Sequence, residues 1–182
     1  MLRALALVGL FLPAAAAAQD LWALLARGGQ VVLVRHAETT PGTGDPPGFR
    51  LEDCTTQRNL SELGRAQARR LGDRFREHRV PVSRVLSSPW CRCIETAEHA
   101  FGVRPDTHPA LGNLFGRAEN RERQVAAFRE LIAERPAQGN LVLVTHGSTT
   151  VALTGEHPAM GEAIVLMPLG AGNFRVAGRI SP

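Results

Sequence analysis

The chain has 182 residues, of which 44% are hydrophobic and 21% are charged, so a single soluble domain with a full hydrophobic core is expected. All 21 basic residues are arginines, and with 17 acidic residues the formal net charge is only +4. The arginines are interleaved with acids along the chain, which argues against a nucleic-acid-binding surface. A mildly positive balance is compatible with an anionic ligand.

The first 18 residues are typical of a secretory signal peptide. Arg3 supplies a positive charge, residues 5–12 form an apolar run too short for a membrane span, and small residues lead up to Ala18. We therefore expect residues 1–18 to be removed and residues 19–182 to form one domain. That domain would be periplasmic or secreted, with no stable membrane anchor after cleavage.

Helical and strand patterns alternate along the rest of the chain. Helices are predicted over residues 21–27, 61–78, 89–101, 121–135 and 149–154, and strands over 31–35, 82–87, 141–144, 163–167 and 174–180. Ser88 and Pro89 are expected as N-cap and first residue of the third helix. Glycine and proline make residues 40–53 a loop. This order predicts an α/β fold, a three-layer α/β/α sandwich with a mostly parallel central sheet.

Polar residues follow three of the predicted strands directly. Arg35 and His36 end the apolar run 31–34, and His146 follows the similar run 141–144. Arg92 comes one helical turn after the strand that ends at Ser87. Because ligands of such sheets bind beyond the carboxyl ends of the strands, we expect two arginines and two histidines at one edge.

Two arginines and two histidines at one point favour phosphoryl chemistry. The forked donors of arginine match the geometry of phosphate, and Arg92 also stands in the first turn of a helix, which favours an anion. Neighbouring positive charge lowers the pKa of a histidine and leaves its attacking nitrogen unprotonated. His36 would accept the phosphoryl group, and His146 would donate to its oxygens.

Several segments together resemble the histidine phosphatase superfamily, which has the phosphoglycerate mutase-like fold. They are "RHAET" (35–39), "DCTTQRNLSELGRAQARRLG" (53–72), "SSPWCRCIETA" (87–97) and "VTHG" (144–147). The resemblance implies that His36 is the phosphorylated nucleophile and that Arg35, Arg92 and His146 form the phosphate pocket. It also implies a metal-independent phosphohydrolase of the histidine acid phosphatase type, without a cofactor.

The general acid of the family is not at its usual place. Where members resembling the mutases carry a glutamate, this chain has Asn113 or a near neighbour. Where the branch that includes phytases carries an aspartate after the second histidine, this chain has Gly147. Glu162, at the start of a late strand, is the preferred candidate, followed by Glu119 and then Asp53.

The three cysteines allow more than one arrangement. In an exported protein Cys54 could pair with Cys91 or with Cys93, which leaves one thiol over. Small buried thiols are an equally good interpretation. A zinc site would need a fourth ligand with matching spacing, and none is evident, so no metal is expected.

Taken together, the sequence predicts an exported phosphomonoesterase that acts through a phosphohistidine. Its partner would be a small phosphorylated substrate, and exported family members that act on lipopolysaccharide core phosphates imply an envelope sugar phosphate. The loop 40–53 is expected to shape specificity. The alternative is a catalytically weak or inactive phosphate-binding module of the cell envelope, which the missing acid would explain.

Overall fold

The computed structural model describes residues 20–133 and 135–182, so the predicted signal peptide lies outside the described residues. Six strands form one sheet in the order β3-β2-β4-β1-β5-β6. The strands β1 to β4 run parallel, while β5 is antiparallel to both of its neighbours. Their bounds are β1 Val31–Arg35, β2 Val82–Ser87, β3 Asp106–Thr107, β4 Asn140–Thr145, β5 Ala163–Gly170 and β6 Asn173–Ile180.

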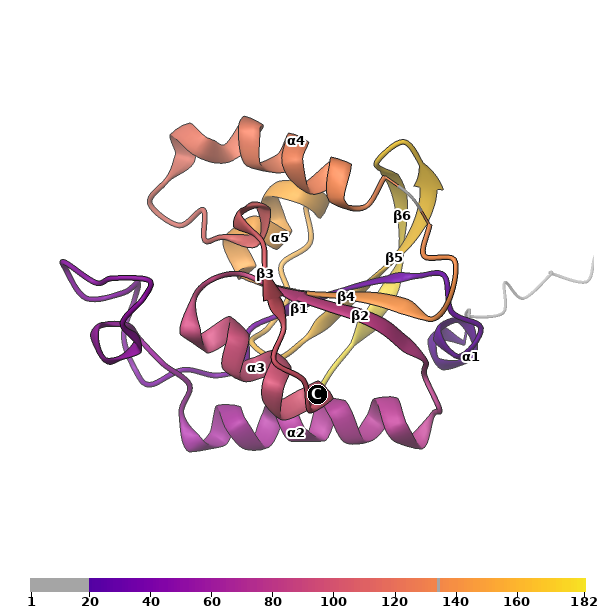
Figure 1. Cartoon of the computed structure of the whole chain (residues 1–182), viewed down its shortest axis with the longest axis horizontal. Helices are drawn as coiled ribbons and strands as arrows, with labels where there is room; N and C mark the ends of the chain where they lie inside the picture. Colours follow the sequence, from indigo (N-terminus) through magenta and orange to yellow (C-terminus); the bar gives the residue numbers. More distant parts are fainter. Residues whose placement is uncertain (1–19, 134) are drawn as a thin grey trace, which may run out of the picture.

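Helices cover both faces of the sheet (Figure 1). On one face lie α2 (Glu62–Glu77) and α3 (Cys91–Phe101), with the short α1 (Leu21–Ala26) joining the same core. On the other lie α4 (Arg121–Leu131) and α5 (Gly147–Thr154). The 3₁₀ helices are η1 Cys54–Thr56, η2 Pro109–Leu111 and η3 Ala118–Asn120. The predicted α/β/α sandwich with a mostly parallel sheet is confirmed.

The central strands are buried on both faces of the sheet, which explains why their sequences are continuously apolar. In β1, Val32 and Val34 pack in the core under α2 and α3, whereas Val31 and Leu33 pack in the core under α4 and α5. All four are fully buried. A strand that is buried on both faces needs apolar residues at every position, and burial of each such side chain stabilises the fold by about 1.5–3 kcal/mol.

The helix α3 begins later than the sequence predicts. Its N-cap is Trp90 and its first residue is Cys91, so the assignment of Ser88 as N-cap and Pro89 as first helical residue is wrong. The hydroxyl of Ser88 lies instead 2.8 Å from Nε2 of His146. Ser88 therefore belongs to the site at the strand ends rather than to the helix.

A disulfide joins the loop region to the start of α3. Cys54 pairs with Cys91, with their Cα atoms 5.7 Å apart. Cys93 is the remaining thiol, and complete burial raises its pKa to about 12. No helix within residues 20–133 and 135–182 has the length and apolar character required to cross a membrane.

Candidate active site

The carboxyl ends of β1 and β4 and the start of α3 meet at one edge of the sheet. Arg35 ends β1 and His36 follows it, while His146 stands between β4 and α5 and Arg92 is the second residue of α3. The backbone N–H of His36 donates to the carbonyl of Thr145 at 2.9 Å, which ties the two strand ends together. All four predicted residues line one cavity of about 670 Å³.

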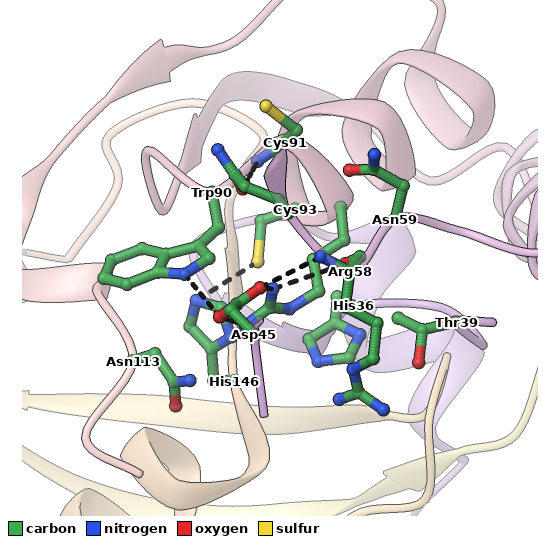
Figure 2. A network of polar contacts seen from close by, with 12 residues as sticks. His36, Thr39, Asp45, Arg58, Asn59, Trp90, Cys91, Cys93, Asn113 and His146 are labelled. Atoms are coloured by element: carbon green, nitrogen blue, oxygen red, sulfur yellow. Dashed lines mark hydrogen bonds and ion pairs between the residues drawn. The ribbon is translucent and has the colours of Figure 1, made fainter. Parts of the chain in front are cut away.

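The rings of His36 and His146 lie beside each other in a T-shaped arrangement and both line this cavity, with ring centroids 5.4 Å apart and ring planes at 67° (Figure 2). Nδ1 of His36 lies 2.9 Å from the carbonyl oxygen of Ala37. A carbonyl oxygen only accepts hydrogen bonds, so in the neutral ring Nδ1 carries the proton and Nε2 keeps its lone pair. Nε2 of His36 is therefore the nitrogen available for nucleophilic attack.

Burial and positive charge keep His36 unprotonated. Burial lowers its pKa most, and the charges of Arg92, Arg35 and Arg58 lower it further, to about 3. The imidazole is therefore neutral at physiological pH, which is the state that a nucleophilic histidine requires.

His146 is held from both of its nitrogens. Nε2 lies 2.8 Å from the hydroxyl of Ser88, and Nδ1 lies 3.4 Å from Nη2 of Arg92. Burial, followed by the neighbouring His36 and Arg92, lowers the pKa of His146 well below its usual value. A bound dianion would oppose this shift, because its negative charge favours the protonated ring.

Arg58 is a third cavity arginine, to which the sequence analysis assigned no role. It lies in the loop between η1 and α2 and lines the same cavity, and its Nη1 donates to the carbonyl of Gly42 at 2.5 Å. Burial, and then the charge of Arg92, lower its pKa. The only sequence signal was its position inside the segment 53–72 that resembles the family.

Three of the four arginines that line the cavity have an unused donor. The Nε atoms of Arg35, Arg58 and Arg92 are buried and have no hydrogen-bond partner among the described residues. A buried, charged donor without a partner is costly, and an oxyanion in the cavity would satisfy such donors. The arrangement therefore fits a phosphate group bound by arginines beside a neutral histidine.

Comparison with known proteins agrees with this geometry. The family model described as the histidine phosphatase superfamily (branch 1) matches residues 31–124. The chain belongs to the histidine phosphatase superfamily. Members of this superfamily are phosphatases. No curated protein matches the chain significantly.

Several solved structures share the fold of this chain. The protein histidine phosphatase SixA complexed with tungstate superposes with a TM-score of 0.60 at 18% identity, over 84% of this chain and 97% of that one. The protein TTHB049 from Thermus thermophilus superposes with a TM-score of 0.54 at 25% identity, over 84% of this chain and 99% of that one. A mycobacterial glucosyl-3-phosphoglycerate phosphatase complexed with VO₃ superposes with a TM-score of 0.56 at 20% identity, over 76% of this chain and 92% of that one.

The three acids proposed from the sequence do not line the cavity of this histidine phosphatase. The backbone of Glu162 does lie at the predicted edge of the sheet, because its carbonyl accepts from the N–H of Arg35 at 3.0 Å. Its carboxylate, however, accepts from the N–H of Ala159 at 2.8 Å and lies 3.5 Å from Nη1 of Arg179. The carboxylate of Glu119 accepts a hydrogen bond from the side-chain amide of its neighbour Asn120 at 3.0 Å.

Asp53, the third candidate acid, caps η1 through the N–H of Thr55 and pairs with Arg50 at an exposed position. Asn113, at the place of the mutase glutamate, does line the cavity, and its Oδ1 accepts from the hydroxyl of Ser148 at 2.8 Å. No group of three or more His, Cys, Asp or Glu side chains suited to a metal occurs in residues 20–133 and 135–182.

Proposed function

We propose that this protein is an exported phosphomonoesterase that hydrolyses a small phosphorylated molecule or an envelope sugar phosphate through a phosphohistidine at His36. One observation carries the proposal. The unprotonated Nε2 of His36 stands in a cavity where three arginines each have an unused, buried Nε–H.

In the first step the arginines bind the phosphoryl group of the substrate and neutralise its charge. Nε2 of His36 attacks the phosphorus, the bond from phosphorus to the ester oxygen breaks, and the leaving oxygen takes up a proton from water. The transition state spreads charge over the non-bridging oxygens, where preorganised guanidinium groups and His146 stabilise it most.

In the second step water attacks the phosphohistidine. The nitrogen–phosphorus bond breaks, inorganic phosphate forms, and the proton of the attacking water leaves with phosphate or solvent. His36 returns to its neutral form, and no metal enters the cycle that we propose.

The name of one similar structure supports a small phosphorylated substrate, whereas the other is named a protein histidine phosphatase. The protein histidine phosphatase was solved with tungstate and the other protein, a glucosyl-3-phosphoglycerate phosphatase, with VO₃, and both ligands are oxyanions. Export is supported by the signal-like residues 1–18 and by the Cys54–Cys91 disulfide, a bond that persists in oxidising compartments.

The test is hydrolysis of an aryl phosphate by the wild type and by His36→Ala. We expect the variant to lose at least about a thousandfold in kcat while it keeps its fold, because the covalent route needs the imidazole. His99→Ala removes a partly exposed histidine of α3 and serves as the matched control. Unchanged turnover in His36→Ala would refute the proposal.

The alternative of an inactive phosphate-binding module has one observation in its favour. The carboxylates of Glu162 and Asp53 are both held by arginines away from the cavity. Calorimetry with inorganic phosphate, beside a turnover assay on the wild type, separates the two functions. Binding without any hydrolysis of phosphorylated metabolites, aryl phosphates or envelope sugar phosphates would favour the module.

A further inference from the structure

Asp45 and Arg92 form a buried ion pair beside the candidate active site, although no step proposed above uses Asp45. Oδ1 of Asp45 accepts from Nη1 of Arg92 at 2.6 Å, and Oδ2 accepts from Nη2 at 3.2 Å. The side chains are only 3% and 1% exposed, respectively. A bidentate pair of this kind fixes the plane of the guanidinium as well as its distance.

Two further donors hold the same carboxylate (Figure 2). The indole N–H of Trp90 donates to Oδ2 at 3.0 Å, and the backbone N–H of Arg58 donates to Oδ1 at 3.2 Å. Burial opposes ionisation of Asp45, but its hydrogen bonds and the charge of Arg92 outweigh burial and hold its pKa below the usual value. Asp45 is therefore an anion that joins the loop 40–53 to the start of α3.

The pair leaves one edge of Arg92 free. A guanidinium has five N–H groups, and Asp45 takes one from each Nη atom. Nε is buried without a partner in the described part of the chain, and Nη2 also lies 3.4 Å from Nδ1 of His146. Arg92 lines the cavity, whereas Asp45 is not among the residues that line it. The Nε edge of Arg92 is thus the edge that Asp45 leaves unpaired.

A carboxylate on this arginine could act in two ways, which predict opposite effects. As an internal anion it would compete with phosphate for Arg92, and its removal would strengthen anion binding. As an anchor it would hold the guanidinium in the orientation that phosphate needs, and its removal would weaken binding despite the loss of a negative charge. The position of Asp45 outside the cavity lining favours the anchor.

We propose that Asp45 is a positioning residue, which fixes Arg92 so that the Nε edge of this arginine binds the phosphoryl group of the substrate. The inference rests on the proposed function. Asp45 acts only through Arg92 and does not touch the reacting atoms.

The test compares the wild type with Asp45→Asn, which keeps the shape of the side chain and removes its charge. Tungstate binding is measured by calorimetry, and kcat and KM are measured with an aryl phosphate. We expect tungstate to bind about tenfold more weakly, which corresponds to about 1.4 kcal/mol. We expect kcat to fall about a hundredfold, as is typical of a misplaced catalytic group.

Asp73→Asn is the matched control, because Asp73 also forms an Asp–Arg pair, with Arg76 at 2.6 Å, but at an exposed position on α2. It should leave both measurements unchanged. Tighter tungstate binding by Asp45→Asn would identify Asp45 as a competitor and overturn the proposal. Unchanged binding and kcat in a variant that only melts at a lower temperature would reduce Asp45 to a structural role and also overturn it.

Trp90→Phe provides a second test if Asp45→Asn does not fold. It removes one of the four donors to Asp45 and keeps the ion pair and an aromatic ring. We expect kcat and tungstate affinity to fall about threefold, and unchanged values of both would contradict the proposal. If the wild type binds tungstate but hydrolyses nothing, the proposed function fails, while the comparison of tungstate affinities still decides the role of Asp45.

Discussion

The site is built from two regions that differ in how they are held. Arg35, His36 and His146 lie at the ends of strands in the middle of the sheet. Hydrogen bonds between the strand backbones and buried side chains surround them there. The segment 40–58, which supplies Asp45 and Arg58, contains only the short η1 and one isolated bridge, between Arg50 and Asp53. The sheet therefore fixes the nucleophile, whereas much of the cationic pocket depends on a few ties between a loop and α3.

Removal of Arg58 tests whether the loop takes part in catalysis. We expect Arg58→Ala to lower kcat/KM about a hundredfold, as the loss of one oxyanion-binding donor typically does. Arg76→Ala, on the surface of α2, is the control and should have no effect on kcat/KM. A change of less than twofold in Arg58→Ala would mean that the strand ends alone bind the substrate.

Removal of the disulfide tests how the loop is held. The Cys54→Ser/Cys91→Ser double variant opens a link between residues separated by 37 positions. We expect the free energy of unfolding to fall by about 2–4 kcal/mol, measured by urea denaturation. Phosphate affinity, measured by calorimetry, should fall while His36 remains competent to be phosphorylated. Full retention of both stability and affinity would show that the loop needs no covalent tie.

The pH dependence of stability tests the burial of the strand-end histidines. The folded pKa of His36 is about 3, whereas an unfolded histidine titrates near 6.5. Between these values the unfolded chain binds a proton that the folded chain does not, so the free energy of unfolding falls as pH is lowered from about 6.5 toward 3.

Urea denaturation of the wild type and His36→Asn between pH 7 and pH 4 measures this contribution. The slope of the variant should be shallower by up to about 1.4 kcal/mol per pH unit, the contribution of one such group. Equal slopes in the wild type and His36→Asn would contradict the burial of a neutral His36.

The smallest effect is expected from Glu162. Its carboxylate is occupied by the N–H of Ala159 and by Arg179, and it does not line the cavity. Glu162→Gln should therefore change kcat for an aryl phosphate by less than about twofold, measured beside the wild type at one pH. A large loss of kcat would make Glu162 the general acid and would require its side chain to turn toward the cavity.

The strand ends of the site can be predicted from the sequence, whereas the contacts of the loop cannot. Continuous apolar runs identify strands buried on both faces, and the residues after such runs must meet at one edge, which places His36 and His146. The pair between Asp45 and Arg92 joins residues 47 positions apart with no periodic pattern, so nothing in the sequence predicts it.

Glu162 shows a second limit of the sequence. The start of β5 does lie at the predicted edge, beside the end of β1, because β5 runs antiparallel to β1. The direction of the carboxylate depends on its contact with Arg179 from β6, the neighbouring strand. A position on a strand can thus be predicted, while the partner that orients its side chain cannot.

The most direct test of the account is the identity of the covalent intermediate. The wild type is mixed with an aryl phosphate labelled with ³²P, quenched in alkali within the first turnover, and digested for peptide mapping. We expect an acid-labile, alkali-stable label on His36, and none in His36→Ala. A wild-type enzyme that turns over the substrate without any such label, or with the label on another residue, would contradict attack by the histidine at the end of β1.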